Sequence, residues 1–156
     1  MVKIKILAIG KDKDRWVSDG QKHFEKLLSR FAKVSSIHIP TPKIASSLSP
    51  VEIKKKEADL FQKQIGTNTF ITLTDKGALF DSILFSKQLE KLITNSNGQL
   101  IFLIGGAYGI DENLISKASF KLSLSPLTFS HQLVRLILLE QLYRAFSIAH
   151  NTDYHK

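Results

Sequence analysis

The sequence contains no cysteine, and this absence excludes disulfides, thiolate chemistry and cysteine-ligated zinc or iron-sulfur sites. It also lacks any apolar run near the ~18 residues needed to cross a membrane. The first ten residues, MVKIKILAIG, carry alternating lysines and too short an apolar core for a signal peptide. Low-complexity tracts and repeats at solenoid periods are missing as well. We therefore expect an ordered cytoplasmic protein without membrane contact.

Length and composition bound the architecture. With 156 residues, 43% hydrophobic and 23% charged, the chain is expected to form one domain, residues 1–156, with a continuous core. Its net charge is +8, and residues 1–66 hold 14 Lys and Arg against 7 Asp and Glu, whereas residues 67–156 hold 8 against 7. Such a one-sided basic field is typical of a polyanion-binding surface. The alternative is a lysine-rich surface that is simply solvated.

Five apolar runs bounded by turn residues predict strands, and helical patterns lie between them. Strands are expected at 2–9, 34–39, 69–73, 99–104 and 120–124, and helices at 15–31, from 50 onward, and at 82–94, 111–118 and 130–150. Residues 40–49 are a loop by composition. Because strands alternate with helices and several strands are apolar on both faces, we expect an α/β domain with a parallel sheet flanked by helices.

Two of the predicted helices have an apolar stripe that shows which side should face the core. The first places an apolar stripe along one side, formed by Trp16, Gly20, Phe24, Leu27, Leu28 and Phe31. The second begins with the capping box of Ser49 and Glu52, and its stripe of Ala58, Phe61 and Ile65 leaves Lys54, Lys55 and Lys56 outward. This lysine triplet either follows an RNA backbone or is solvated.

The last predicted helix, at 130–150, is apolar almost all the way round. A helix of this kind must be buried on all sides, and in so small a chain a second subunit is the most economical cover. We therefore predict a homodimer with this helix in the interface, where Glu140 and Arg144, four residues apart, can pair.

Three predicted strand ends are candidates for a ligand site, because ligands of open parallel sheets bind beyond the carboxyl ends of the strands. They are ITLTDKG at 71–77, IGGAYG at 104–109 and LSLSPLTFSH at 122–131. The glycines of the second lack the G-x-G-x-x-G spacing of a dinucleotide site, and no Walker pattern follows, so a structural turn is the alternative. The third is uncharged until His131 and suits a neutral aromatic base rather than a phosphate.

The motifs LIGGAYG, LSLSPLTFSHQLVRLILLEQLYRAFSI and the terminal YHK, in this order and spacing, resemble the RlmH family of SPOUT-class methyltransferases. This resemblance covers essentially the whole chain. It implies methylation of N3 of a pseudouridine in large-subunit (23S) ribosomal RNA, a C-terminal deep trefoil knot, a homodimer, and S-adenosyl-L-methionine as cofactor. The cofactor residues implied by the motifs are Leu73, Gly105, Gly106, Leu124, Ser125, Pro126, Leu127, Thr128 and Phe129.

The chain departs from the family pattern at two positions. Relatives commonly have Asp after the strand-end leucine, where this chain has Thr74 followed by Asp75, and the usual Pro before the terminal Tyr-His is Asp153. The role of the carboxylate and the rigidity of the tail are therefore open.

Methyl transfer from a sulfonium needs alignment and a base for the imide proton, but no metal. The catalytic candidates are His131, Arg135, Tyr154 and His155, the last two reaching the partner's site in a dimer, as the resemblance implies. Arg135 and Arg144 would stabilise an imide anion or bind phosphate, or else pair with Glu140. The expected contacts to RNA, presented by the whole ribosome, are Lys11, Lys13, Arg15, Lys54, Lys55 and Lys56.

Two other readings stay open on these residues. The first is a non-enzymatic, ribosome-associated RNA-binding factor whose glycine turn is purely structural. The second, a nucleotide-dependent oxidoreductase, is disfavoured by the glycine spacing and by the missing acidic residue for a ribose.

Overall fold

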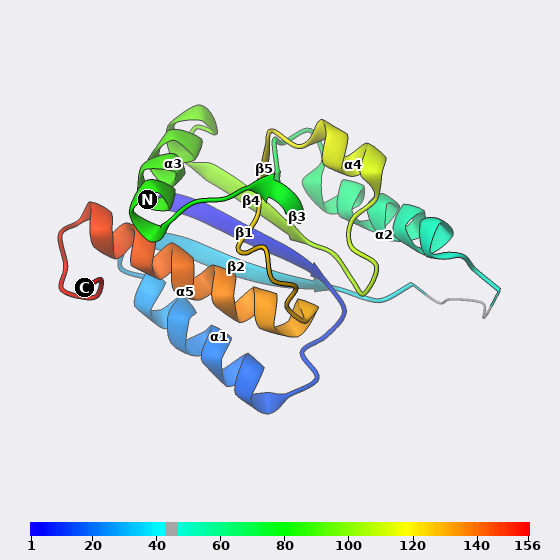
Figure 1. The fold of residues 1–156 in the computed structure, drawn as a ribbon, viewed down its shortest axis with the longest axis horizontal. Coiled ribbons are helices and arrows are strands. Elements are labelled where there is room, and N and C mark those ends of the chain that lie inside the picture. Colours follow the sequence, from blue (N-terminus) through cyan, green and yellow to red (C-terminus); the bar gives the residue numbers. More distant parts are fainter. Residues whose placement is uncertain (43–46) are drawn as a thin grey trace.

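Five parallel strands form one sheet in the order β2-β1-β4-β3-β5 in the computed structural model, which describes residues 1–42 and 47–156 (Figure 1). The strands are β1 (Val2–Ile9), β2 (Ala32–Ile39), β3 (Ile71–Ala78), β4 (Gln99–Ile104) and β5 (Phe120–Leu122). The helices are α1 (Arg15–Leu28), α2 (Pro50–Ile65), α3 (Ser82–Asn95), α4 (Glu112–Lys117) and α5 (His131–Ala149). The predicted α/β class with a parallel sheet is confirmed.

Two hydrophobic cores cover the two faces of the sheet. Alternate residues of β1 and β4 point to opposite sides, so that Ile6 and Phe102 join one core and Leu7 and Leu103 the other. The first core receives α1, α3 and α5, and the second receives α2 and α4. The central strands are therefore buried on both faces, as their unbroken apolar runs predict.

The strands at one edge of the sheet differ from prediction. Strand β3 extends to Ala78 instead of ending at residue 73, and β5 ends at Leu122 instead of residue 124. The register between them shifts between Leu73 and Ala78. Gly77 allows this irregular pairing, because a Cβ there would lie 2.6 Å from the backbone carbon of Leu122.

Local signals place the helix starts correctly. The capping box of Ser49 and Glu52 is present, and α5 begins where the Ser130 hydroxyl accepts from the amide of Leu133. The predicted loop at 40–49 falls in part on residues 43–46, outside the described residues.

The predicted stripe of α1 is wrong at its first residue. Trp16 is 59% exposed, and its neighbour Val17 is buried instead. The fully buried residues of α1 are Val17, Gln21 and Leu28, and the predicted stripe residues Phe24, Leu27 and Phe31 pack half-buried against the same core.

Helix α5 lies between α1 and α3 on the same face of the sheet (Figure 1). Its buried residues include Leu138, Leu139 and Leu142, whereas Leu133 and Ile137 are only half-buried. The predicted pair forms, with Arg144 Nη2 2.6 Å from Glu140 Oε1. Among the described residues, no helix combines the length and apolar character that crossing a membrane requires.

Candidate active site

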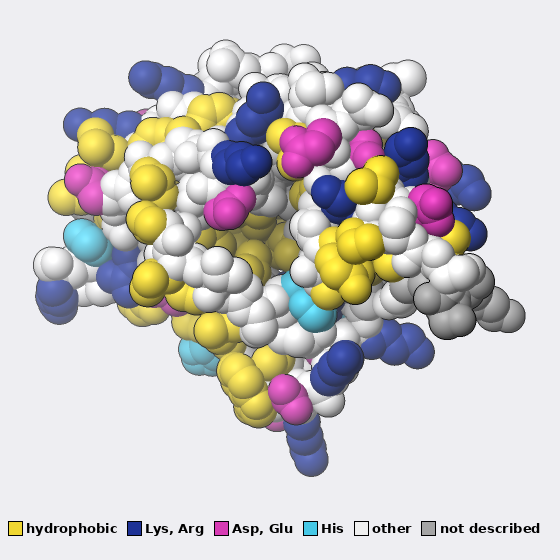
Figure 2. Space-filling view, turned by 45° about the vertical axis from the view of Figure 1, so that its right-hand side comes forward, with side chains coloured by type: hydrophobic (Ala, Val, Ile, Leu, Met, Phe, Trp, Pro, Cys, Tyr) yellow, Lys and Arg dark blue, Asp and Glu magenta, His cyan; other side chains and the backbone are white. Residues whose placement is uncertain are grey.

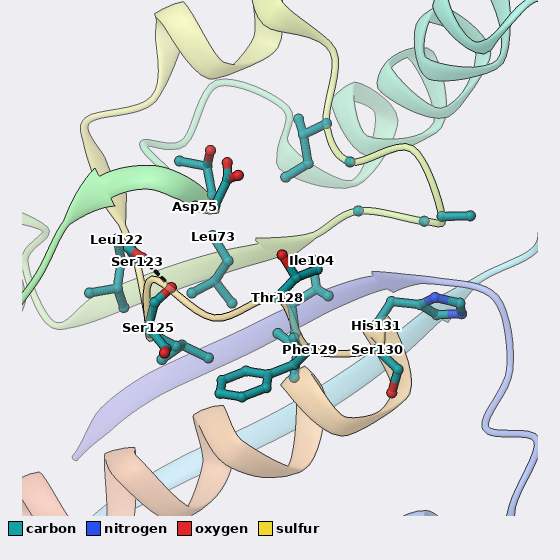
Figure 3. Close-up of a pocket in the computed structure, with 18 of the residues that line it drawn as sticks. Leu73, Asp75, Ile104, Leu122, Ser123, Ser125, Thr128, Phe129, Ser130 and His131 are labelled. Carbon is teal, nitrogen blue, oxygen red and sulfur yellow. Dashed lines mark hydrogen bonds between the residues drawn. The ribbon is translucent and has the colours of Figure 1, made fainter.

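A cavity of about 530 Å³ opens at the carboxyl end of β4, beside Leu73 to Asp75 in the middle of β3. Figure 2 shows the hollow in this face of the molecule, with hydrophobic side chains inside it and charged ones around its rim. Leu73 of β3 and Ile104 of β4 lie at the sheet side, and the segment from Ser123 to Ser130 runs beneath them (Figure 3). The cavity therefore lies where open parallel sheets bind their ligands.

The predicted cofactor residues gather at this cavity with one exception. Eight of the nine line it: Leu73, Gly105, Gly106, Leu124, Ser125, Leu127, Thr128 and Phe129. Pro126 does not. Residues far apart in the chain thus meet because β5 lies at the sheet edge, while α5 starts beside β1, so the connecting segment crosses β3 and the end of β4.

The connecting segment carries no charge and is held by its own hydroxyls. Ser123 Oγ donates to the carbonyl of Ser125 at 3.1 Å, and Ser125 Oγ accepts from the amide of Leu127 at 3.0 Å (Figure 3). Backbone amides, carbonyls and the Thr128 hydroxyl remain for a ligand. A wall of this kind suits an uncharged heteroaromatic group, as the sequence predicts.

The glycine turn after β4 has little room for side chains, because other parts of the same chain lie close to it. A Cβ on Gly105 would lie 2.6 Å from the backbone carbon of Gly109, and one on Gly106 would lie 2.8 Å from Glu57 Oε2. Gly109, whose φ is +83°, donates its amide to the carbonyl of Gly106 at 3.1 Å. Gly105 is thus required by neighbouring backbone whether or not a ligand touches the turn, whereas a side chain at Gly106 would have to displace the Glu57 carboxyl group.

His131, the first residue of α5, lines the cavity (Figure 3). Burial lowers the pKa of its imidazole, and the positive charges of Arg135 and Lys13 lower that pKa further. The ring is therefore neutral near pH 7, so one of its nitrogens can accept a proton.

Arg135 does not line the cavity. It is only 1% exposed, its Nη1 donates to Asp12 at 2.9 Å, and its Nη2 donates to the carbonyl of Ile9. Asp12 also accepts from Gln21 at 2.9 Å and lies 3.6 Å from His38. The alternative pairing of Arg135 with Glu140 is wrong, because the guanidinium instead ties α5 to the end of β1.

The tail residues lie at the other end of α5. Tyr154 donates its hydroxyl to Glu140 at 3.0 Å, and Arg144 Nη1 lies 3.2 Å from His155 Nδ1. Arg144 also sits over the Tyr154 ring at 4.8 Å. Glu140 and Arg144 follow His131 by about 14 and 20 Å along the helix, and neither Tyr154 nor His155 lines the cavity of its own chain.

The tail's contacts also affect its titration. Burial raises the pKa of Tyr154, and its hydrogen bond to Glu140 raises that pKa further. The phenol therefore stays protonated at neutral pH and donates.

The basic candidates divide between two places. Lys11, Lys13 and Arg15 are exposed on the segment after β1, which Gln132 anchors through the carbonyl of Lys11 and the amide of Lys13. They therefore lie near the start of α5. Lys55 and Lys56 are exposed and Lys54 half-buried on α2, which covers the opposite face of the sheet.

Several features of the site have weaker sequence signals. Asp75 and Tyr108 line the cavity beside the predicted motifs, and Tyr108 is 55% exposed. Glu57 is a buried carboxyl behind the glycine turn, and its signal is positional, because it follows Ile53 and precedes Phe61 by four residues on the buried stripe of α2. The described residues contain no group of three His, Asp or Glu that could hold a metal ion.

Known proteins resemble the chain along its full length. Residues 2–155 match the family described as "Predicted SPOUT methyltransferase". Two relatives, from Desulforamulus reducens and Acetivibrio thermocellus, are named ribosomal RNA large subunit methyltransferase H. The first is 39% identical and covers 100% of both chains, and the second is 38% identical and covers 99% of this chain and 100% of the relative.

Solved structures share the fold. The tRNA (m1G37) methyltransferase from Aquifex aeolicus superposes with a TM-score of 0.54 at 14% identity, covering 91% of this chain and 69% of that one. A methyltransferase from Legionella pneumophila, in complex with SAM, gives 0.51 at 14% identity, covering 93% and 66%. The chain belongs to the SPOUT methyltransferases and, within them, to the ribosomal RNA large subunit methyltransferase H family.

Proposed function

We propose that this protein uses S-adenosylmethionine to methylate N3 of a pseudouridine in 23S ribosomal RNA, on the assembled ribosome in the cytoplasm. Membership in a family of ribosomal RNA methyltransferases supports this activity. The observation that carries the proposal is the cavity at the end of β4 and beside the middle of β3, where eight motif residues predicted for the cofactor come together. We further propose that residues 1–156 act as one domain.

The cavity fits the cofactor in size and chemistry. Its volume of about 530 Å³ lies within the ~300–1,000 Å³ of small-molecule sites. The segment from Leu124 to Phe129 would hold the adenine through backbone groups, and Leu73 would pack on it. When bound, S-adenosylmethionine supplies the methyl group, the N–CH3 bond forming at N3 as the CH3–S bond breaks with its electron pair left on sulfur.

The protein's own residues orient the acceptor and receive its proton. In the proposed mechanism, the neutral imidazole of His131 accepts the N3 proton from within the cavity. Arg135 is a positioning residue, because its buried bonds to Ile9 and Asp12 hold the start of α5 in place. The base is thereby fixed against the sheet.

The site is proposed to be completed by a second copy of the chain. Tyr154 and His155 lie at the far end of α5 from their own cavity, and Leu133 and Ile137 leave an apolar, half-buried side of that helix for a partner. In a homodimer packed through α5, the tail would reach the partner's cavity. The crossing of 123–130 is where we place the C-terminal trefoil knot.

Ribosomal RNA is proposed to approach the open side of the cavity. Lys11, Lys13 and Arg15, anchored beside the start of α5, would contact the backbone near the modified base. Lys54, Lys55 and Lys56 on α2 would contact more distant RNA. The target base must be unpaired or flipped out, because its N3 is otherwise inaccessible.

The proposal is tested by supplying the protein and S-adenosylmethionine to ribosomes from cells that lack it. We expect N3-methylpseudouridine in the 23S RNA, measured by mass spectrometry of nucleosides. S-adenosylmethionine should also raise the melting temperature, since a ligand that binds only the folded state stabilises it. Stabilisation by NAD alone would contradict the proposal, and no response to either would favour a non-enzymatic RNA-binding factor.

A further inference from the structure

Glu57 is a buried carboxyl group for which the proposed mechanism has no use. Its side chain is 4% exposed, and Oε1 has no hydrogen-bond partner among the described residues. It lies on the inward stripe of α2 with Ile53, Phe61 and Ile65. Burying such a group without a partner is costly, so its position calls for an explanation.

The carboxyl group is aimed at the back of the cavity wall. Its Oε2 lies 2.8 Å, and its Oε1 3.3 Å, from the point where a Cβ of Gly106 would stand. Gly106 itself lines the cavity. A ligand atom that touches Gly106 is thus separated from the carboxyl group by the thickness of a single backbone.

The surroundings of Glu57 contain no fixed counter-charge among the described residues. None of the ion pairs within 4.0 Å among these residues includes Glu57, and Ile9 of β1 lies beside the same Gly106 position as the carboxyl group. On α2, Lys54 lies one turn earlier and is half-buried, but burial alone accounts for the pKa of Glu57, which it raises to about 7. A cation entering the cavity would change this balance.

We propose that Glu57, through the Gly106 turn, recognises the positive charge of the sulfonium and makes the cavity prefer the cationic methyl donor to its neutral product. This rests on the proposed function, because S-adenosylmethionine must be the ligand. The sulfonium loses its charge when the methyl group leaves, so the attraction ends with the reaction. Glu57 therefore favours binding before transfer and release after it.

The sign of the pH effect follows from this arrangement. Below about pH 7 the carboxyl is protonated and exerts little attraction on a cation. Above that pH it is ionised, and a bound cation stabilises the ionised form, so binding of S-adenosylmethionine releases a proton near pH 7. S-adenosylhomocysteine has a neutral sulfur, so its binding neither stabilises the ionised carboxyl group nor releases a proton.

The test measures binding of S-adenosylmethionine and S-adenosylhomocysteine by calorimetry at pH 6 and pH 8, in wild type, Glu57→Gln and Asp59→Asn. Asp59 is an exposed carboxylate on the same helix and serves as the matched control. In wild type and the control, the preference for S-adenosylmethionine should rise about two- to fivefold from pH 6 to pH 8, the size expected when binding shifts the pKa of Glu57 by ~0.5–1 unit. In Glu57→Gln, the preference for S-adenosylmethionine over S-adenosylhomocysteine should not rise with pH.

A second readout needs no variant. Near pH 7, calorimetry in buffers of different ionisation heat should show that wild type releases protons with S-adenosylmethionine and not with S-adenosylhomocysteine. An equal pH response in wild type and Glu57→Gln, or equal proton release with both ligands, overturns the role of Glu57 while leaving the proposed function intact. If neither ligand binds the wild type, the proposed function fails and this inference fails with it.

Discussion

Single residues of the site have their charge states set mainly by burial. Burial raises the pKa of Glu57 to about 7, so that about half of these carboxyl groups are protonated at pH 7, and it lowers the pKa of His131, whose ring is neutral there. Arg135 is more deeply buried than either, and its Nη1 lies 2.9 Å from Asp12 Oδ1. The consequence for stability is clearest at Glu57, which forms no ion pair with the residues that the structure describes.

Glu57→Gln should stabilise the protein at high pH. The carboxyl titrates at 4.5 when exposed and at about 7 when folded, so ionisation favours the unfolded chain, and stability falls as pH rises from 4.5 to 7. At pH 8.5 the variant should exceed wild type in free energy of unfolding by about 3 kcal/mol, and at pH 5 by under about 1 kcal/mol. Urea unfolding at both pH values measures this; an equal difference at both would contradict it.

At the scale of elements, the irregular pairing of β3 with β5 shapes the cavity. Leu73 lines it just before the register shift, and Ser123 lines it just after β5 ends. Gly77 makes the shift possible, because its missing side chain leaves room for the backbone of Leu122 and Ser123. A side chain at position 77 should therefore disturb both the pairing of β3 with β5 and the shape of the cavity.

Gly77→Ala should lower the free energy of unfolding by about 2–4 kcal/mol, the range for a methyl group forced into closely packed surroundings. Its Cβ would meet three backbone atoms at 2.6–2.8 Å, and backbone cannot move aside cheaply. The comparison variant is Gly66→Ala, which has open space around it, so its loss comes only from the strain of placing alanine at a φ of +62°, about 1–2 kcal/mol. Urea titration of both variants decides; equal losses would refute the role of close packing.

Prediction from sequence works where the determining contacts are local. Helix starts follow from caps such as Ser49 and Asp111, and buried strands follow from their apolar runs. Prediction from sequence fails where contacts with a segment distant in the chain determine a residue's position. Trp16 is exposed because α1 is oriented by α5, and Arg135 is withdrawn from the cavity because Asp12, 123 positions away, binds it.

The gathering of the motif residues was predictable in kind, since strand ends of a parallel sheet meet at one edge. The contact between Glu57 and Gly106 was not, because it joins two elements through tertiary packing alone.

At the scale of the whole molecule, α5 separates the two halves of the proposed site. His131 is its first residue, and the tail packs back against Glu140 in the middle of the helix and against Arg144 one turn further on. The cavity and the tail of one chain are therefore fixed apart by a rigid helix. In the proposed site, which uses both a cavity and a tail, the tail must therefore come from a second chain.

Deleting Tyr154 to Lys156 should abolish methylation of ribosomes while leaving the dimer and cofactor binding in place. The deleted residues lie outside α5 and remote from their own cavity, so neither the helix nor the cavity loses a wall. Methylation is measured by mass spectrometry, the dimer by sedimentation and binding by calorimetry. Asp153→Asn, an exposed change just before the deleted residues, is the control and should stay active. Full methylation by the shortened chain would show that the tail is dispensable.

The glycine turn behind the cavity has a consequence for how such proteins are compared. Gly105 has no room for a side chain because the backbone of Gly109, part of the same chain, lies against it. A related protein that no longer bound a methyl donor would still need this glycine to close the turn. A glycine at this position in a related sequence therefore indicates only that the turn is intact. The uncharged segment from Leu124 to Phe129 is the better indicator of a functional cofactor site.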